Sequence, residues 1–165
     1  MRTPEESIRR LIFECAEMLD SANYDGLGQL FARATVHVTG VNAPIKGSDD
    51  ICDFFDGMNH RDSDGSPGTR FLTSNTIVDF SDDERSARSR SYFVCFQGSK
   101  SHLAPIAAGR YHDQFSRAAG GWDFTERRVV LDLFGQMDDH VRYNPGTSTV
   151  DAAKVIATAR EAQRK

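Results

Sequence analysis

The sequence predicts an α+β domain with helices in its first part and an antiparallel sheet in its second. Residues 4–58 carry apolar side chains mostly at helical spacing, whereas residues 71–132 alternate and are rich in β-branched and aromatic side chains. At 165 residues the chain fits one domain that buries roughly 70% of the surface of its unfolded form. Helices followed by a meander of strands are typical of the α+β class.

The first helix is expected to begin after Thr3 and to run to about Asp20. Thr3 suits the N-cap, Pro4 the first helical position and Glu6 the third, which together form a capping box. The apolar residues that follow recur at helical spacing: Ile8, Leu11, Ile12, Cys15 and Leu19. These side chains are therefore expected in the core.

Two more helices and one short strand are expected before residue 60. A short helix starts at Asn23 and passes through Phe31, and residues 35–39 alternate as a first strand. Ser48 can cap a third helix. The apolar side chains of that helix again have helical spacing: Ile51, Phe54, Phe55 and Met58.

A polar loop separates these helices from the strands. Residues 60–69 are rich in Gly, Pro, Ser and Asp, and we expect this loop to cap the interior of the domain. Strands are expected over residues 71–80 and 87–97. One face of the second strand carries mainly small residues, which would let a helix lie close: Ala87, Ser89, Ser91, Phe93 and Cys95.

The last two strands are expected to form a long hairpin. Residues 109–115 and 122–132 flank a turn that ends in Gly120-Gly121. Alternation groups three side chains of each strand on one face: Tyr111, Asp113 and Phe115 on the first, and Asp123, Thr125 and Arg127 on the second. Polar groups on an otherwise apolar surface favour a ligand pocket.

The C-terminal part of the chain is expected to be a helical extension. Residues 144–146 break the chain before a weakly amphipathic helix over residues 148–160. We therefore divide the chain into a domain, residues 1–143, and a helical tail, residues 144–165. The tail is as compatible with a subunit contact as with the core.

Composition narrows the class of partner. The net charge is -4 and the isoelectric point about 5.7, without a basic cluster, which argues against nucleic acid. No apolar run approaches the ~20 residues of a membrane span, and a secretory signal is not evident, so we expect a soluble cytoplasmic protein. Cys15, Cys52 and Cys95 lack metal-ligand spacing, so reduced thiols are expected, with no metal site and no cofactor.

Several segments between Pro4 and Asp132 carry a family resemblance: Leu19-Asp20, Tyr24-Asp25-Gly26-Leu27, Leu30-Phe31, Gly109-Arg110-Tyr111 with Asp113 and Phe115, Gly121-Trp122, and Glu126 to Asp132. With this order of elements, the chain resembles SnoaL-like proteins of the nuclear transport factor 2-like superfamily. The resemblance implies a cone-shaped, curved mixed sheet packed on the N-terminal helices and enclosing a hydrophobic cavity. The family includes polyketide cyclases, dehydratases, isomerases, dehydrochlorinases and epoxide hydrolases, as well as catalytically silent members.

The resemblance also implies site residues. In the dehydratase and dehydrochlorinase branch, an Asp at the end of the first helix orients a His that removes a proton next to a leaving group. Asp20 matches that Asp, and Arg127 matches an Arg that faces the pocket. Phe71, four residues before Asn75, stands where the branch has its His. General-base catalysis typically contributes ~10²–10⁴ in rate, so the branch's standard base is missing here.

Three side chains are candidates for catalysis. Asp20 is the candidate acid or base, Tyr111 the group that polarises a carbonyl, and Arg127 the anchor for an anionic or oxygen-bearing group. Structural alternatives stay open, because Asp20 can merely end its helix and Arg127 can pair with Asp113 or Glu126. The candidate ligand-binding residues are Tyr24, His37, Phe71, Asn75, Tyr92 and Asp113. No role is expected for the remaining histidines: His60, His102, His112 and His140.

The expected activity is cofactor-independent conversion of a hydrophobic, oxygenated small molecule by cyclisation, dehydration or isomerisation, in secondary metabolism or catabolism. The absence of the family His favours a second class, a ligand carrier or an assembly subunit similar to the small β subunit of ring-hydroxylating dioxygenases. The outer face of the sheet is expected to form a homodimer interface through apolar side chains: Val94, Phe96, Val130 and Leu133.

Overall fold

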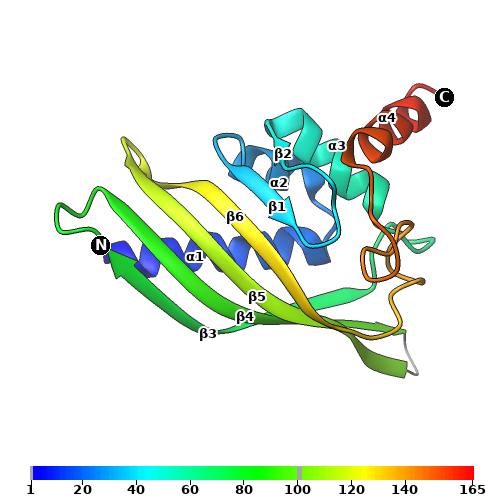
Figure 1. Ribbon diagram of the computed structural model, residues 1–165, viewed down its shortest axis with the longest axis horizontal. Helices are drawn as coiled ribbons and strands as arrows, with labels where there is room; N and C mark the ends of the chain where they lie inside the picture. The colour runs from blue at the N-terminus through cyan, green and yellow to red at the C-terminus, as the bar shows by residue number, and fades with distance from the viewer. Residues whose placement is uncertain (1, 100–101) are drawn as a thin grey trace.

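The computed structural model describes residues 2–99 and 102–165 and shows a curved, open sheet over the N-terminal helices (Figure 1). The helices are α1 (Pro4–Asp20), α2 (Tyr24–Leu30), α3 (Ser48–Met58) and α4 (Ala152–Gln163). The strands are β1 (Thr35–Val38), β2 (Ile45–Lys46), β3 (Thr69–Phe80), β4 (Ser86–Ser99), β5 (His102–Ala118) and β6 (Gly121–Phe134). The predicted α+β class and the cone-shaped arrangement are confirmed.

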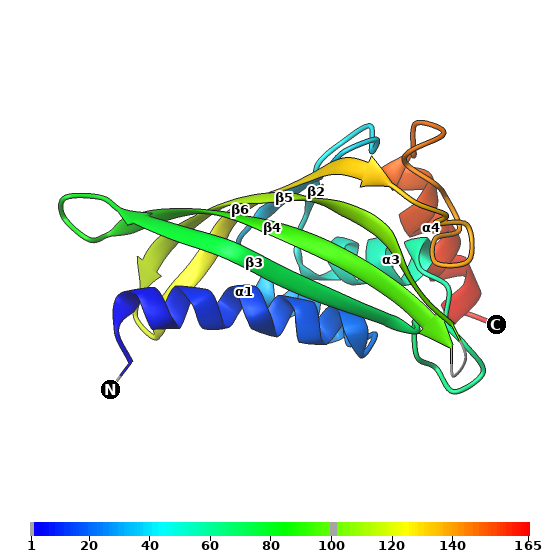
Figure 2. The same cartoon turned by 90° about the horizontal axis from the view of Figure 1, so that it is seen from below.

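The six strands form one mixed sheet in the order β2-β1-β6-β5-β4-β3. Strands β3 to β6 form an antiparallel meander, and β1 joins it by pairing parallel to β6. Strands β3 to β6 are long, and their curvature leaves a hollow on one side of the sheet. Figure 2 shows α1 running along that hollow side, beneath β3 and β4.

The predicted start of α1 is confirmed in detail. The Thr3 hydroxyl accepts a hydrogen bond from the Glu6 backbone N–H at 3.2 Å, and the Glu6 carboxylate accepts one from the Thr3 N–H at 2.7 Å. The amphipathic stripe then turns toward the sheet, because burying it removes apolar surface from water. Ile8, Ile12 and Cys15 are buried, and Leu11 and Leu19 are half-buried against them.

A β-bulge corrects the predicted faces of the last strand. Phe115 pairs with Phe124 and Gln114 with Glu126, so Thr125 is an extra residue on β6. The bulge reverses the alternation, and Phe124 on one side of it and Arg127 on the other are both buried. Asp123 and Thr125 therefore do not share the inward face with Arg127. The predicted inward face of β5 is confirmed, since its three residues are buried: Tyr111, Asp113 and Phe115.

Helix α4 packs on α3 rather than extending away from the domain (Figure 1). Val155 and Ala159 are buried at this contact. Arg160 of α4 donates hydrogen bonds to Asp53 at 2.6 Å and to Asp50 at 2.7 Å, both on α3. Helix α4 thus holds α3 in place, and α3 forms one wall of the interior of the domain. Among the described residues, no helix is both long enough and apolar enough to cross a membrane.

Candidate ligand cavity

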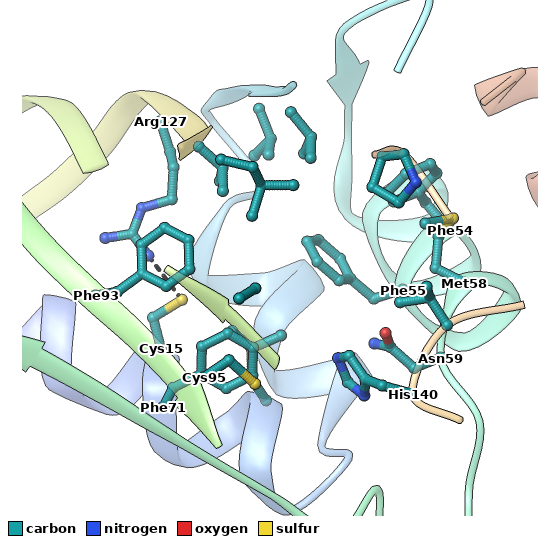
Figure 3. A pocket seen from close by; sticks show the side chains of 18 of the residues that line it. Cys15, Phe54, Phe55, Met58, Asn59, Phe71, Phe93, Cys95, Arg127 and His140 are labelled. Carbon is teal, nitrogen blue, oxygen red and sulfur yellow. Dashed lines mark hydrogen bonds between the residues drawn. The ribbon is translucent and has the colours of Figure 1, made fainter. Parts of the chain in front are cut away.

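A cavity of about 110 Å³ lies between the hollow side of the sheet and the helices (Figure 3). Side chains from α1, α3, β1 and β3 to β6 line it, and most of them are aliphatic or aromatic. The lining residues that carry nitrogen or oxygen in their side chains are Asn59, Tyr111, Arg127 and His140. Apolar walls with a few polar groups are the usual composition of a small-molecule site.

The segment after β6 closes one end of the cavity, in place of the loop predicted to cap it. The lining includes Met137, His140, Val141 and Pro145, but no residue of 60–69 among those described. The loop 60–69 folds on itself instead, with the Asp62 N–H donating to the Ser66 carbonyl at 2.7 Å. This turn pairs backbone groups of the loop with one another. The segment after β6 closes the cavity instead.

A buried ion pair forms one polar end of the cavity. Arg127 donates two hydrogen bonds to the Asp113 carboxylate, at 2.8 and 2.7 Å, and a third to the Cys15 sulfur at 2.9 Å. The two charged side chains are only 3% and 0% exposed. Burial alone would lower the pKa of Arg127, but the charge and hydrogen bonds of Asp113, with Cys15 and Tyr111, together outweigh burial and raise that pKa. The structure therefore selects Asp113 as the partner of Arg127.

Tyr111 lies against this ion pair. Its ring stacks on Phe93 with centroids 4.4 Å apart, and the Arg127 guanidinium lies over it at 4.2 Å. Within residues 2–99 and 102–165, no group hydrogen-bonds to the Tyr111 hydroxyl. Burial raises the pKa of this phenol, so it stays neutral and can only donate or accept a hydrogen bond.

The opposite end of the cavity carries His140 and Asn59, far from Arg127 in the view of Figure 3. The Asn59 amide donates to the Tyr24 hydroxyl at 3.1 Å. His140 is 6% exposed, and its ring lies 6.4 Å from the ring of Phe71. Burial, with the charge of His60, lowers the pKa of His140 to about 4, so the imidazole is neutral at neutral pH.

Asp20 lies at the end of α1 and holds the start of β3. Its carboxylate accepts hydrogen bonds from the Phe71 N–H, at 3.0 and 3.1 Å, and from the Thr69 hydroxyl at 3.1 Å. Burial raises the pKa of Asp20, and these hydrogen bonds oppose the rise. Asp20 itself is not among the described residues that line the cavity, although its neighbours Leu19 and Phe71 are.

Of the sequence candidates, Phe71, Tyr111 and Arg127 line the cavity, while Asp113 contacts it through Arg127. Tyr24 is buried behind Asn59 rather than in the lining.

Three predicted binding residues lie elsewhere. His37 alternates with Val36 and Val38, which line the cavity, so it belongs to the opposite face of β1. Tyr92 is 52% exposed, because it lies on the outer face of β4. The helices and the cavity lie on the other face of β4, which carries the small residues. Asn75 is exposed at a β-bulge of β3 with φ of 52°.

Asn59 and His140 line the cavity although neither was a predicted binding residue, and the expectation of no role for His140 is not supported by its position. Asn59 follows the last residue of α3, and His140 lies in an irregular segment after β6. Neither position has a periodic pattern that would indicate a buried side chain. For the described part of the chain, no group of three or more His, Cys, Asp or Glu side chains could hold a metal ion.

Comparison with known proteins agrees with this arrangement. The family model of the SnoaL-like domain matches residues 3–128. No curated protein sequence matches the chain. Solved structures show the same fold, and the three described next share less than 25% sequence identity with this chain.

A candidate scytalone dehydratase from Novosphingobium aromaticivorans is 23% identical, with a TM-score of 0.64 over 79% of this chain and 85% of its own. ActVI-ORFA from Streptomyces coelicolor is 18% identical, with a TM-score of 0.64 over 78% of this chain and 96% of its own. The β subunit of a candidate aromatic-ring-hydroxylating dioxygenase from Novosphingobium aromaticivorans is 14% identical, with a TM-score of 0.60 over 79% and 90%. The family model of the SnoaL-like domain matches most of the length of the chain, and the curved sheet and apolar cavity agree with it. The chain therefore belongs to the SnoaL-like family.

Proposed function

We propose that this chain binds a compact, largely apolar, oxygenated small molecule and converts it by proton transfer without a cofactor. The supporting observation is the apolar cavity, which has separate polar groups at its two ends. Its volume of about 110 Å³ approaches the ~150 Å³ of an engineered cavity that binds benzene, which favours a ligand the size of a single ring. The proposed reaction is a cyclisation, dehydration or isomerisation. The proposed setting is secondary metabolism in the cytoplasm.

A non-catalytic role is the second candidate function. Phe71 replaces the imidazole of the dehydratase branch, and the nitrogens of Arg127 are directed to Asp113 and Cys15. One structural neighbour is the β subunit of a candidate aromatic-ring-hydroxylating dioxygenase, and so one component of an assembly. Under this alternative the cavity holds a ligand unchanged or supports an assembly.

Filling the cavity tests ligand binding. Ala107→Leu places a larger side chain in the lining, and we expect it to weaken binding of toluene by about tenfold or more, at a stability cost of ~1–3 kcal/mol. The matched control is Ala108→Leu, on the next residue of β5, which lies outside the lining and should leave toluene binding unchanged. Calorimetric titration gives both affinities. Equal toluene binding by both variants would place the ligand elsewhere.

Asp20 is proposed as the acid or base of the conversion, since burial raises its pKa and the Phe71 that it holds lines the cavity. Asp20→Asn keeps the shape of the side chain and an oxygen for the Phe71 N–H. We expect turnover of the authentic substrate to fall ~10²-fold or more, with ligand binding nearly unchanged. Turnover and thermal unfolding are measured together. Full turnover in a folded Asp20→Asn protein would leave Asp20 a purely structural role.

A homodimer is proposed through the outer face of the sheet. Leu72, Val94 and Leu133 form one cross-strand row there with Ala108, and Leu72 and Leu133 are exposed. Apolar rows of this kind are seldom left in water. Sedimentation at micromolar concentration should show a species of twice the 18.4 kDa chain mass, and a monomer alone would contradict the proposal.

A further inference from the structure

His140 is a buried imidazole with an unused hydrogen-bonding nitrogen in the wall of the cavity. The side chain is 6% exposed, and it is one of the lining residues. Its Nδ1 is buried and has no hydrogen-bond partner in the described part of the protein. Buried polar atoms are nearly always paired, so an orphaned nitrogen at a cavity wall indicates a partner supplied by the ligand.

The backbone on both sides of the ring is fixed, which keeps the imidazole in this place. The His140 N–H donates to the Met137 carbonyl at 2.8 Å, and the His140 carbonyl accepts from the His60 N–H at 2.8 Å. The next residue, Val141, forms an antiparallel bridge with Asn59 at the end of α3. The segment is thus held to the end of α3 from His140 onward, and to its own preceding turn through Met137.

The surroundings of the ring offer little to a water molecule. Phe71 lies against the imidazole, and Phe55 and Met58 are further lining residues at this end (Figure 3). The Asn59 amide already donates to the Tyr24 hydroxyl. A water that pairs with His140 would have Asn59 as its one further polar partner among the described lining residues at this end, fewer than the ~3 hydrogen bonds that buried waters typically make. A hydroxyl carried on an apolar body pairs with the nitrogen and fills the apolar space as well.

We propose that His140 selects the ligand: its free ring nitrogen pairs with a hydroxyl group of a ring-sized molecule, at the end of the cavity opposite Arg127. A neutral imidazole has one N–H donor and one acceptor nitrogen, and a hydroxyl can pair with either. The preferred ligand class is therefore an alcohol or a phenol rather than a hydrocarbon. This inference rests on ligand binding in the cavity and does not depend on catalysis.

Phenol and toluene are the probes, because they have nearly the same size and differ in the hydroxyl. Replacing His140 with an apolar residue of similar volume, His140→Leu, should weaken phenol binding by about tenfold and leave toluene binding unchanged or tighter. The matched control is His60→Gln, which alters an exposed neighbouring histidine and should keep the preference for phenol. Calorimetric titration measures all three proteins with both probes.

A second measurement uses only the unaltered protein. Phenol, but not toluene, should shift the imidazole ¹⁵N resonances of His140 in the unaltered protein. Binding of both probes with equal affinities in His140→Leu and the unaltered protein, or an unmoved His140 resonance, overturns the role of His140 while the cavity remains a binding site. Binding of neither probe by the unaltered protein overturns both this inference and the proposed function.

Discussion

Arg127→Met alone should lower the free energy of unfolding by about 3–5 kcal/mol, the range for removing one partner of a buried ion pair. The loss arises because the Asp113 carboxylate would stay buried without the two hydrogen bonds that Arg127 donates. Replacing both residues, Arg127→Met with Asp113→Leu, removes both charges and should restore most of the stability. Urea unfolding of the single and double variants measures the difference.

Arg128→Met is the matched control, because Arg128 is the next residue on β6 and its side chain is exposed. Its pairing with Glu126 is a surface interaction, for which a change within ~1 kcal/mol is expected. A loss below 1 kcal/mol for Arg127→Met would show that the pair does not hold the core. The double variant also separates two roles of Arg127, since unchanged ligand binding in it would exclude the predicted anchor role.

Local chemistry made much of the fold predictable. The capping box, the apolar stripe of α1 and the Gly-Gly turn of the hairpin are each signals that lie within a few residues of one another. Faces of strands were predictable wherever alternation continued without interruption, as on β5. One extra residue at a bulge was enough to misplace Thr125, because each slip by one position exchanges the two faces.

The site was less predictable than the fold, for two physical reasons. Which face of a strand meets the helices depends on long-range packing, so Tyr92 and His37 were predicted to line the pocket together with Tyr111, the preferred candidate. His140 reaches the cavity through a segment without regular structure, held by backbone contacts to a helix end distant in sequence. A sequence carries no periodic signal for such a contact. The resemblance located Phe71 at the cavity but not the imidazole beside it.

The buried state of His140 should make the protein lose stability as the pH falls from 7 to 5. An unfolded His binds a proton near its ordinary pKa of about 6.5, whereas burial and the charge of His60 hold the folded pKa at about 4. Between these values the unfolded state binds more protons, so stability is full above pH 6.5 and declines as the pH falls. Over this interval the loss due to His140 is about 2 kcal/mol.

His140→Leu removes this proton uptake. Between pH 7 and pH 5 the unfolding free energy of this variant should fall by about 2 kcal/mol less than that of the unaltered protein. The other groups near the ring do not imitate the effect: Tyr24 is a buried phenol whose pKa burial raises further, and Asp20 has a raised pKa, which favours the folded state at low pH. His112→Gln, on the exposed face of β5, should keep the original slope. Urea midpoints at several pH values measure the slopes, and identical slopes for His140→Leu and the unaltered protein would mean that the imidazole is already charged or solvated in the folded state.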